Sequence, residues 1–286
     1  MNQNPKTGLL LEGGSMRGLY TAGILDVMME HDIRVDGMIA VSAGATFGVN
    51  FKSRQIGRTI RYNTRFARDP RYCSLWSLLT TGDLYGAEFD YYRLPEELDP
   101  FAFERFSADP TEFYAVVTDV DTGKPVYHRL TDLHGEGMEW IRASASMPVA
   151  SRPVEIGGHK YLDGGCSDAI PIHWWEEKAG YRKNIIILTQ PEEYVKNPMR
   201  GSSILEVLLH DYPNLSDSLN NLHIAYNECL RHIAEQEAAG NAFVFRPDEA
   251  LEVGKIENDP NKMKKTYETG RRIAEARMPE LLAFLG

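Results

Sequence analysis

The amino-acid sequence predicts an α/β protein built on a largely parallel sheet, and three observations near its N-terminal end support this fold class. A short apolar strand candidate at residues 8–12 runs into a glycine-rich loop at residues 13–18. Apolar residues then recur at helical spacing over residues 19–29. A second apolar run, residues 38–41, completes a strand–helix–strand unit. Because such a unit joins neighbouring parallel strands, we expect a mainly parallel sheet.

The second strand ends at Ser42, which has only small residues beside it, in the order Ala-Val-Ser-Ala-Gly. A serine on a sharp strand-to-helix turn has a strained backbone, and the residues two before and two after it must be small. The stretch is therefore typical of a nucleophile elbow, with Ala40 in place of the first glycine and Gly44 as the second. The alternative is a buried strand followed by a helix for which Ser42 is the N-cap.

The glycine-rich loop has three functional interpretations. A dinucleotide-binding loop would need glycine where this chain has Ser15, and a P-loop would need a terminal Gly-Lys-Ser/Thr that is absent. An oxyanion hole uses loop amides to stabilise the negative charge on an attacked carbonyl. Only this third interpretation makes use of the serine elbow one strand later. A tight turn into a helix remains the structural alternative.

A helix is expected over residues 45–66. Five arginines within this range and just after it are spaced alternately four and three residues apart. The spacing predicts that all five project from one face. Such a face would suit lipid headgroups or another anionic partner, whereas the alternative is a solvated face paired with acids elsewhere in the fold. Residues 71–100, without a clear period, are either a cap or an insertion. The five arginines are Arg54, Arg58, Arg61, Arg65 and Arg68.

The middle of the chain contains further strand and hairpin signals. β-Branched and aromatic runs indicate strands, and Gly157-Gly158 indicates a tight hairpin turn. An Ala- and Ser-rich helix ending at Pro148 could pack very close to a neighbour. The predicted elements are strands at residues 113–120 and 184–189, a hairpin partner at residues 126–128, the small-residue helix at residues 140–147 and a hairpin at residues 153–162.

In the C-terminal part of the chain, apolar residues recur mainly at helical spacing. We predict two units: a catalytic domain, residues 1–190, and a mostly helical subdomain, residues 191–286, packed on its core. Pro213 and Pro279 are expected to break or kink the helices of the second unit. Its predicted elements are a helix at residues 215–233, a strand at residues 242–246 and a closing helix at residues 263–282.

Composition excludes several classes of function. A net charge of -10 disfavours nucleic acid as a partner, because a polyanion is bound through clustered Lys and Arg. The three cysteines have no metal-like spacing and suit a reducing cytoplasm. The N-terminal segment, residues 1–7, is polar and the apolar run behind it is too short for a signal peptide. No apolar stretch approaches the roughly 20 residues that span a bilayer, so we expect a cytoplasmic protein whose membrane contact, if any, is peripheral.

A serine hydroxyl needs a base to become a nucleophile. None of the eight histidines stands in a distinctive context, although His173 or His223 could serve in an ordinary Ser–Asp–His triad. Asp163 ends a strand and is followed by two glycines, which would expose a carboxylate at a sheet edge. The alternative role for Asp163 is that of a turn former.

Three motifs in order resemble the patatin-like phospholipase family, in its bacterial branch. They are Gly-Gly-Ser-Met-Arg-Gly at residues 13–18, Ala-Val-Ser-Ala-Gly at residues 40–44 and Asp-Gly-Gly at residues 163–165. The stretches Arg-Ala-Ser-Ala-Ser-Met-Pro at residues 142–148 and Asp-Ala-Ile-Pro at residues 168–171 also resemble the family. The resemblance extends from about residue 8 to residue 189, and the C-terminal third is similar to the tail of an uncharacterised bacterial subgroup.

The resemblance implies a three-layer α/β/α fold and a serine acyl hydrolase with a Ser–Asp dyad, no histidine, no metal and no cofactor. It assigns Ser42 as the nucleophile and Asp163 as the base, and the substrate would be a lipid or another ester. The amides of Gly13, Gly14 and Ser15, with Arg17 nearby, would form the oxyanion hole. The chain departs from the family at Ser15 and Ala40. The alternative function is therefore a catalytically impaired lipid-binding or regulatory protein.

Overall fold

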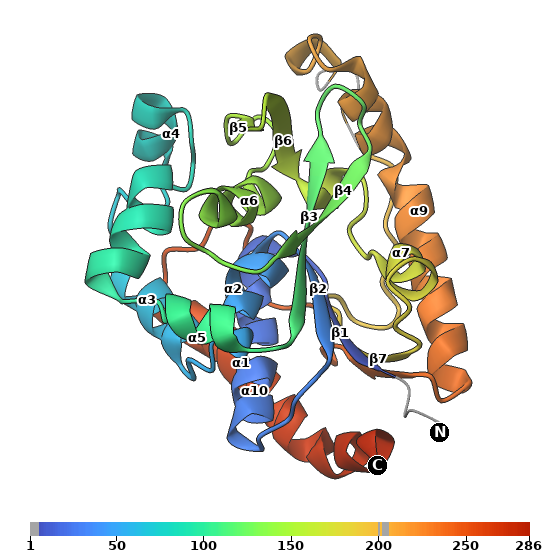
Figure 1. Cartoon of the computed structure of the whole chain (residues 1–286). Helices are drawn as coiled ribbons and strands as arrows, with labels where there is room; N and C mark the ends of the chain where they lie inside the picture. Colours follow the sequence, from blue (N-terminus) through green and yellow to red (C-terminus); the bar gives the residue numbers. More distant parts are fainter. Residues whose placement is uncertain (1–5, 200, 202–205) are drawn as a thin grey trace.

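The computed structural model describes residues 6–199, 201 and 206–286. Residues 1–5, which belong to the polar N-terminal segment, lie outside the described residues. The described strands form one mixed sheet with helices on both faces, so the predicted three-layer α/β/α fold is confirmed (Figure 1). No described helix is both long enough and apolar enough to cross a membrane.

The sheet is parallel at its centre and antiparallel at one end. The strand order is β5-β6-β3-β2-β1-β7-β8, and β4 pairs with β3 beside this path. The pairs β1–β2, β1–β7, β2–β3 and β7–β8 are parallel, while β3 is antiparallel to both β4 and β6. The strands are β1 Thr7–Leu11, β2 Gly37–Val41, β3 Glu112–Asp119, β4 Pro125–Leu130, β5 Val154–Ile156, β6 His159–Asp163, β7 Lys183–Ile187 and β8 Ala242–Phe245.

The helices cover the two faces of this sheet unequally. Helices α1, α2, α6 and α10 contribute to the core on one face, and α7 and α9 to the core on the other. The helices are η1 Ser15–Arg17, α1 Gly18–Glu30, α2 Ala43–Lys52, α3 Arg58–Phe66, α4 Leu75–Thr81, the π-helix η2 Phe89–Leu98, α5 Phe103–Ala108, α6 Glu136–Ala145, η3 Gly164–Cys166, α7 Ile172–Glu177, α9 Pro213–Ala238 and α10 Pro260–Leu285.

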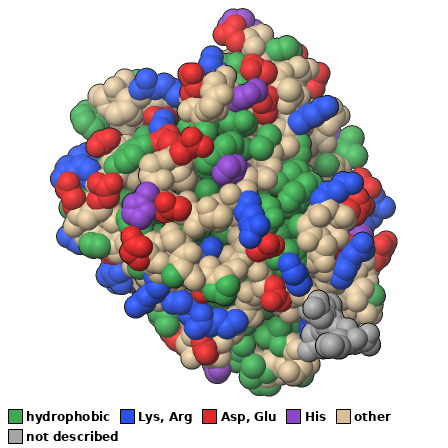
Figure 2. Space-filling view, in the orientation of Figure 1, with side chains coloured by type: hydrophobic (Ala, Val, Ile, Leu, Met, Phe, Trp, Pro, Cys, Tyr) green, Lys and Arg blue, Asp and Glu red, His purple; other side chains and the backbone are tan. Residues whose placement is uncertain are grey.

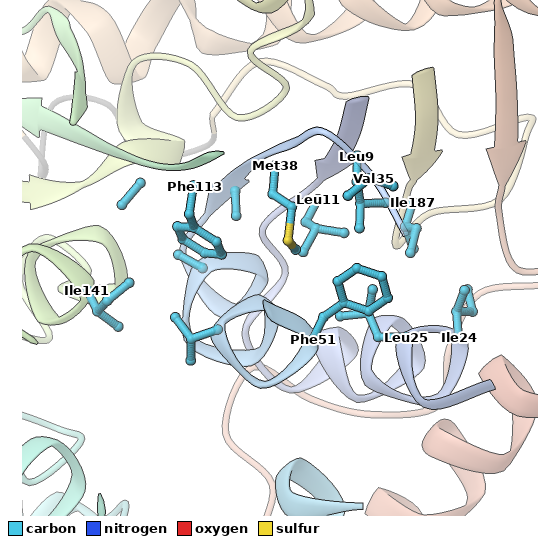
Figure 3. Packing of buried hydrophobic residues seen from close by; sticks show 14 of the residues in the cluster. Leu9, Leu11, Ile24, Leu25, Val35, Met38, Phe51, Phe113, Ile141 and Ile187 are labelled. Carbon is cyan, nitrogen blue, oxygen red and sulfur yellow. The ribbon is translucent and has the colours of Figure 1, made fainter. Parts of the chain in front are cut away.

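Alternate residues of the central strands point to opposite faces of the sheet. Leu9 and Leu11 of β1 pack with Ile24 and Leu25 of α1 (Figure 3). Leu10 packs in a second cluster, on the face covered by α7 and α9. Because both faces are covered, the central strands are continuous apolar runs rather than alternating ones.

The continuous helix predicted over residues 45–66 is wrong, because the structure has two helices there. Helix α2 ends at Lys52 and α3 begins at Arg58. Between them Arg54 and Gly57 have φ angles of 56° and 72°, in the left-handed region that a right-handed helix excludes. The turn is held by the Arg54 guanidinium, which donates to the carbonyl oxygens of Met29 and Ile33 at 2.9 and 3.1 Å.

The prediction that five arginines project from one helix face is also wrong. Arg58 is only 4% exposed and donates to the Asp99 carbonyl oxygen at 2.7 Å. Arg61 makes two hydrogen bonds to the Asp99 carboxylate, at 2.7 and 2.8 Å. Arg65 donates to the Leu98 carbonyl oxygen at 2.9 Å. These side chains therefore hold the segment at the end of η2 against α3. The alternative, a solvated face paired with acids elsewhere in the fold, describes Arg61, which is 54% exposed and paired with Asp99, but not the buried Arg58.

The remaining elements agree with the predicted strands, hairpins and helices within a few residues. Both predicted hairpins are present, as β3–β4 and β5–β6. Pro213 lies in the first turn of α9, where its missing N–H costs nothing. Pro279 lies inside α10, which continues past it, so of the predicted break or kink the break does not occur. The division into residues 1–190 and 191–286 stays a prediction.

Candidate active site

Ser42 lies at the turn between β2 and α2 with φ 56° and ψ -124°. This is a strained conformation for a residue other than glycine and is typical of a nucleophile elbow. Gly44 is required by close packing, because a Cβ there would lie 2.8 Å from the carbonyl oxygen of Leu11 and 2.9 Å from that of Glu12. Ala40 is fully buried inside β2, so its methyl group is accommodated in the core.

The Ser42 hydroxyl donates a hydrogen bond of 2.6 Å to the Oδ2 atom of Asp163. The two residues are far apart in the sequence, and β3 brings them together. Strand β2 pairs with β3 so that Val41 lies opposite Val116, and β6 pairs with the same strand so that Asp163 lies opposite Val117. Both side chains are buried, with 8% exposure for Ser42 and 6% for Asp163.

Hydrogen bonds hold both the carboxylate and the backbone of Asp163. Its Oδ1 atom accepts from the Gly165 amide at 2.8 Å, and its own amide donates to the Ser146 carbonyl oxygen at 2.8 Å. Burial raises the pKa of Asp163 from 3.8 to about 6, while the hydrogen bonds from Ser42 and Gly165 and the charge of Lys255 act in the opposite direction. A carboxylate with a raised pKa is a stronger base than a solvated one.

The glycine-rich loop lies directly beside Ser42. A Cβ at Gly13 would lie 2.9 Å from the Cβ of Ser42, and a Cβ at Gly14 would lie 2.8 Å from the Thr189 hydroxyl oxygen. Ser15 adopts φ 50°, and its hydroxyl contacts the Met147 sulfur at 3.6 Å. The amides of Gly13, Gly14 and Ser15 form no hydrogen bond with any residue that the structure describes. Three amide donors are thus available next to the serine.

Arg17 stands slightly apart from this group. It is in η1, and its Nε atom is buried without a hydrogen-bond partner among the described residues. Its positive charge lowers the pKa of Glu12, although burial has the larger and opposite effect on that carboxyl. Arg17 does not line the pocket at Ser42. Of the four residues predicted for the oxyanion hole, Gly13 lies against Ser42 and Ser15 lines the same pocket as Ser42, while Gly14 stands between them in the loop and Arg17 follows two residues later.

Two groups of residues that support the site were missed by the sequence analysis. The Ser144 hydroxyl accepts from the Ser42 amide at 3.0 Å and donates to the Val116 carbonyl oxygen at 2.7 Å. The sequence signal that could have identified Ser144 is its position in the Ala- and Ser-rich helix, because that helix was expected to pack very close to a neighbouring element. Ser144 fixes the backbone of the strained turn.

The second group links the glycine loop to the C-terminal part of the chain. The Glu12 carboxylate accepts from the Thr189 amide at 2.6 Å and from the Tyr226 hydroxyl at 2.6 Å. The Thr189 hydroxyl has two acceptors within reach, Glu12 Oε2 at 3.1 Å and the Gly13 carbonyl oxygen at 3.3 Å. No sequence pattern indicated this set, because its members are brought together only by the ends of β1 and β7 and by α9.

A pocket that is partly open to solvent begins at Ser42. Its wall is mainly apolar and aromatic, with contributions from α2, η2 and α6. Asp90 is a polar exception: its Oδ1 atom is buried and has no hydrogen-bond partner among the described residues. Burial raises the pKa of Asp90 well above 3.8. Residues that represent the wall are Phe47, Tyr62, Tyr91, Leu94, Ile141 and Met147.

The two histidines proposed for a triad lie outside this pocket. His173 packs against His232 with ring centroids 4.7 Å apart, and His223 contacts the Asn220 carbonyl oxygen through Nδ1 at 3.0 Å. Within residues 6–199, 201 and 206–286, no histidine is hydrogen-bonded to Ser42 or Asp163. The same residues contain no cluster of three or more His, Cys, Asp or Glu that could hold a metal ion.

Comparison with known proteins defines the class to which this fold and site belong. The family model described as patatin-like phospholipase matches residues 9–173, more than half of the chain. The chain therefore belongs to the patatin-like phospholipase family, as its three motifs predicted. A second model, a domain of unknown function (DUF6363), matches residues 212–286. The predicted boundary at residue 190 falls between the two matched ranges.

Individual relatives are more distant. The uncharacterized protein YjjU of Escherichia coli (strain K12) is 29% identical over 202 residues, which are 68% of this chain and 55% of YjjU. The lysophospholipase NTE1 of Meyerozyma guilliermondii is 25% identical over 274 residues, covering 85% of this chain and only 17% of that protein. The crystal structure of VipD from Legionella pneumophila aligns with a TM-score of 0.46 at 10% identity, covering 97% of this chain and 67% of that one.

Proposed function

We propose that this protein is a serine acyl hydrolase that cleaves carboxylic esters of lipids with a Ser42–Asp163 dyad. The single observation that carries the proposal is the 2.6 Å hydrogen bond from the Ser42 hydroxyl to the Asp163 carboxylate, at a strained elbow that opens into an apolar pocket. Family membership supports the reaction class. The printed name of NTE1, a lysophospholipase, supports lipid esters as the substrate class.

In the proposed reaction, Ser42 Oγ attacks the ester carbonyl carbon while its proton moves to Asp163 Oδ2. The carbonyl oxygen becomes negatively charged and is stabilised by the loop amides of Gly13, Gly14 and Ser15. Collapse of this tetrahedral intermediate breaks the carbon–oxygen bond, and the leaving alcohol takes the proton from Asp163. An acyl group then remains on Ser42.

The second half of the reaction removes that acyl group. A water molecule attacks the acyl carbon and gives its proton to Asp163, and the same loop amides stabilise the second oxyanion. When the bond to Ser42 Oγ breaks, the serine recovers a proton from Asp163 and the carboxylic acid is released. Asp163 acts as base and then as acid in each half, for which a pKa of about 6 is suitable.

Labelling with a fluorophosphonate tests the proposal directly, because this probe forms a covalent bond with an activated serine. We expect wild-type protein to be labelled, Ser42→Ala to be unlabelled and Asp163→Asn to react far more slowly. Ser107→Ala, which removes an exposed serine outside the pocket, is the matched control and should label as wild type does. Equal labelling of wild type and Ser42→Ala would contradict the proposal.

The two predicted units of the chain have different roles in this proposal. We propose that residues 1–190 carry the catalytic machinery and that residues 191–286 form a mostly helical subdomain that supports it. The contact between Tyr226 and Glu12 supports this division of labour. The alternative of an impaired lipid-binding protein would be favoured if lipid bound in the pocket while no ester hydrolysis depended on Asp163.

A further inference from the structure

Three large apolar side chains of α4 are exposed on the surface. Leu75, Trp76 and Leu79 are 69%, 56% and 86% exposed. Residues at positions i, i+1 and i+4 of a helix lie within an arc of about 100°, so these three share one face. Exposed apolar clusters of this kind mark interaction surfaces on soluble domains.

The orientation of α4 is fixed by polar contacts on its inner side. Ser77 is 1% exposed, and its hydroxyl donates to the Asp83 carbonyl oxygen at 2.8 Å. Its amide donates to the hydroxyl oxygen of the N-cap residue Ser74 at 2.9 Å. The helix thus turns a serine inward and leucine and tryptophan outward. Leu78 also turns inward and packs against a core cluster, so α4 carries apolar side chains on both its inner and its outer side. An outer apolar face suits an apolar medium outside.

Helix α4 lies between Tyr72 and Tyr85, which both line the pocket, although no residue of α4 itself lines it. The segment after it is tied to the loop after α6, since the Leu84 amide donates to the Ala150 carbonyl oxygen at 2.8 Å. In that loop Val149 is 54% exposed, while Met147, two residues earlier, lines the pocket. Exposed apolar side chains therefore lie on two segments, α4 and the loop after α6, that are hydrogen-bonded to each other beside the pocket lining.

A second loop carries another exposed apolar residue beside the pocket lining. Tyr85 lines the pocket, and its hydroxyl donates to the Lys255 carbonyl oxygen at 3.3 Å. Ile256, the next residue, is 50% exposed. We call the exposed apolar residues of the two loops and α4 the rim surface. It consists of Leu75, Trp76, Leu79, Val149 and Ile256.

Two basic side chains lie at the rim surface beside the acids Asp83, which accepts from the Arg152 amide at 2.9 Å, and Glu257, which is within 3.7 Å of Lys262. Arg152 follows Val149 closely and packs against Gly82 at the end of α4. Lys255 precedes Ile256, and its charge acts on Asp163. Both side chains are exposed, and neither forms an ion pair with any described residue. Lys and Arg beside exposed apolar groups are the combination attracted to an anionic lipid surface.

We propose that the rim surface docks on a lipid bilayer that carries anionic headgroups, with Leu75, Trp76 and Leu79 entering the interface. Docking in this way places the pocket opening against the layer from which an ester substrate leaves. This inference rests on the proposed function for the identity of the substrate, but the binding itself does not depend on catalysis. In Figure 1 α4 projects at the upper-left edge of the molecule, and hydrophobic side chains lie at the same edge in Figure 2.

Binding is measured by sedimentation with vesicles of phosphatidylcholine, with and without phosphatidylglycerol, in a Ser42→Ala background that prevents hydrolysis. We expect stronger binding to the anionic vesicles and a blue shift of tryptophan emission that Trp76→Phe reduces. The variant Leu75→Ser/Trp76→Ser/Leu79→Ser should bind at least about tenfold more weakly. The control Val207→Ser/Leu208→Ser/Ile224→Ser removes side chains that are 72%, 56% and 58% exposed elsewhere, and should bind unchanged.

Hydrolysis of a water-soluble butyrate ester separates this proposal from the proposed function. For this measurement the α4 triple variant carries the wild-type Ser42. We expect it to hydrolyse the soluble ester at the wild-type rate and to lose activity on vesicles. Equal vesicle binding by the α4 variant, or a wild-type dimer that the α4 changes dissociate, would overturn the docking proposal. Vesicle binding that the α4 changes abolish, without any ester hydrolysis by wild type, would uphold docking and overturn the hydrolase.

Discussion

Ser42 and Asp163 are both buried at a position where solvent has little access, and this burial determines the chemistry that the pair can perform. An exposed aspartate has a pKa near 3.9 and is a poor base for a hydroxyl. Here burial raises the pKa of Asp163 to about 6, and the direct hydrogen bond from Ser42 gives proton transfer a short path. In the proposed mechanism the site therefore needs no histidine between the two groups.

The raised pKa predicts the pH dependence of hydrolysis. Asp163 acts as a base only as the carboxylate, which predominates above pH 6 and is lost by protonation as the pH falls through this value. We expect kcat/KM for a soluble ester to be level above about pH 7 and to fall about tenfold per pH unit well below pH 6. Rates between pH 4.5 and 8.5, with circular dichroism to verify folding, would check this. A level profile down to pH 4.5 would contradict it.

Asp90 offers a test of the pocket wall, because its Oδ1 atom is buried without a partner among the described residues. Replacing a buried unsatisfied polar group with an apolar one of similar size removes a desolvation cost of about 1–3 kcal/mol. We expect Asp90→Leu to raise the thermal midpoint by a few degrees and to lower KM for octanoate relative to butyrate esters. Asp90→Asn, which keeps a polar group, is the control. A lower midpoint in Asp90→Leu would show that the carboxyl is satisfied in solution.

Tyr226 tests whether the C-terminal part positions the glycine loop. Tyr226→Phe removes the 2.6 Å hydrogen bond to Glu12, which holds Thr189 and through it Gly13. Because small displacements of oxyanion donors reduce rate more than binding, we expect kcat to fall about tenfold with KM nearly unchanged. Tyr114→Phe serves as the control, because the Tyr114 hydroxyl forms no hydrogen bond with any described residue. A change in KM alone would contradict a positioning role.

At the scale of elements, the crossing of α1 and α10 depends on two glycines. A Cβ on Gly23 would collide with the Tyr267 carbonyl oxygen, and a Cβ on Gly270 would collide with that of Tyr20. Since both obstacles are backbone atoms, a side chain could be admitted only by moving the helices apart. Helix α1 follows the glycine loop directly, so its placement also bears on the active site.

We expect Gly270→Ala to lower the free energy of unfolding by about 1–3 kcal/mol, the usual cost of overpacking, despite the better helix propensity of alanine. The measurement is urea unfolding followed by circular dichroism. Glu268→Ala, an exposed position on the same helix, is the control and should be near neutral. A stabilised Gly270→Ala would mean that the two helices are not in close contact in solution.

At the scale of the whole molecule, the sheet crosses the predicted boundary at residue 190. Strand β8 pairs with β7, and Phe243 and Phe245 join Leu9 and Leu11 in one core cluster. Residues of α10, among them Ile273, complete the same cluster. Residues 191–286 thus share a hydrophobic core with residues 1–190.

We therefore expect residues 1–190 produced alone to lack a cooperative thermal transition, because the loss of β8 and α10 exposes one side of β7 and of α1. Thermal unfolding followed by near-ultraviolet circular dichroism would measure this. The full chain is the control. A cooperative transition at the wild-type midpoint in the truncated chain would contradict a shared core.

The sequence by itself determined the type of most elements and the three motifs. Local chemistry carries that information: Ser42 needs small neighbours, the loop at Gly13 needs absent side chains, and buried parallel strands need continuous apolar runs. The break after Lys52 was not predictable from periodicity, because Arg54 takes its left-handed conformation from carbonyl groups on a different helix and loop. Periodicity also predicts an outward-facing Arg58, whereas the side chain is buried because its hydrogen-bond acceptor is the distant Asp99 carbonyl oxygen.

Only the tertiary structure decided how distant segments meet. The pairing of β2 and β6 with β3 brings Asp163 to Ser42, and α9 brings Tyr226 to Glu12. The outward orientation of α4 likewise depends on Ser77 finding a partner six residues later in a folded loop. Such contacts depend on strand register and on packing between elements, which the order of residues along one segment does not encode locally.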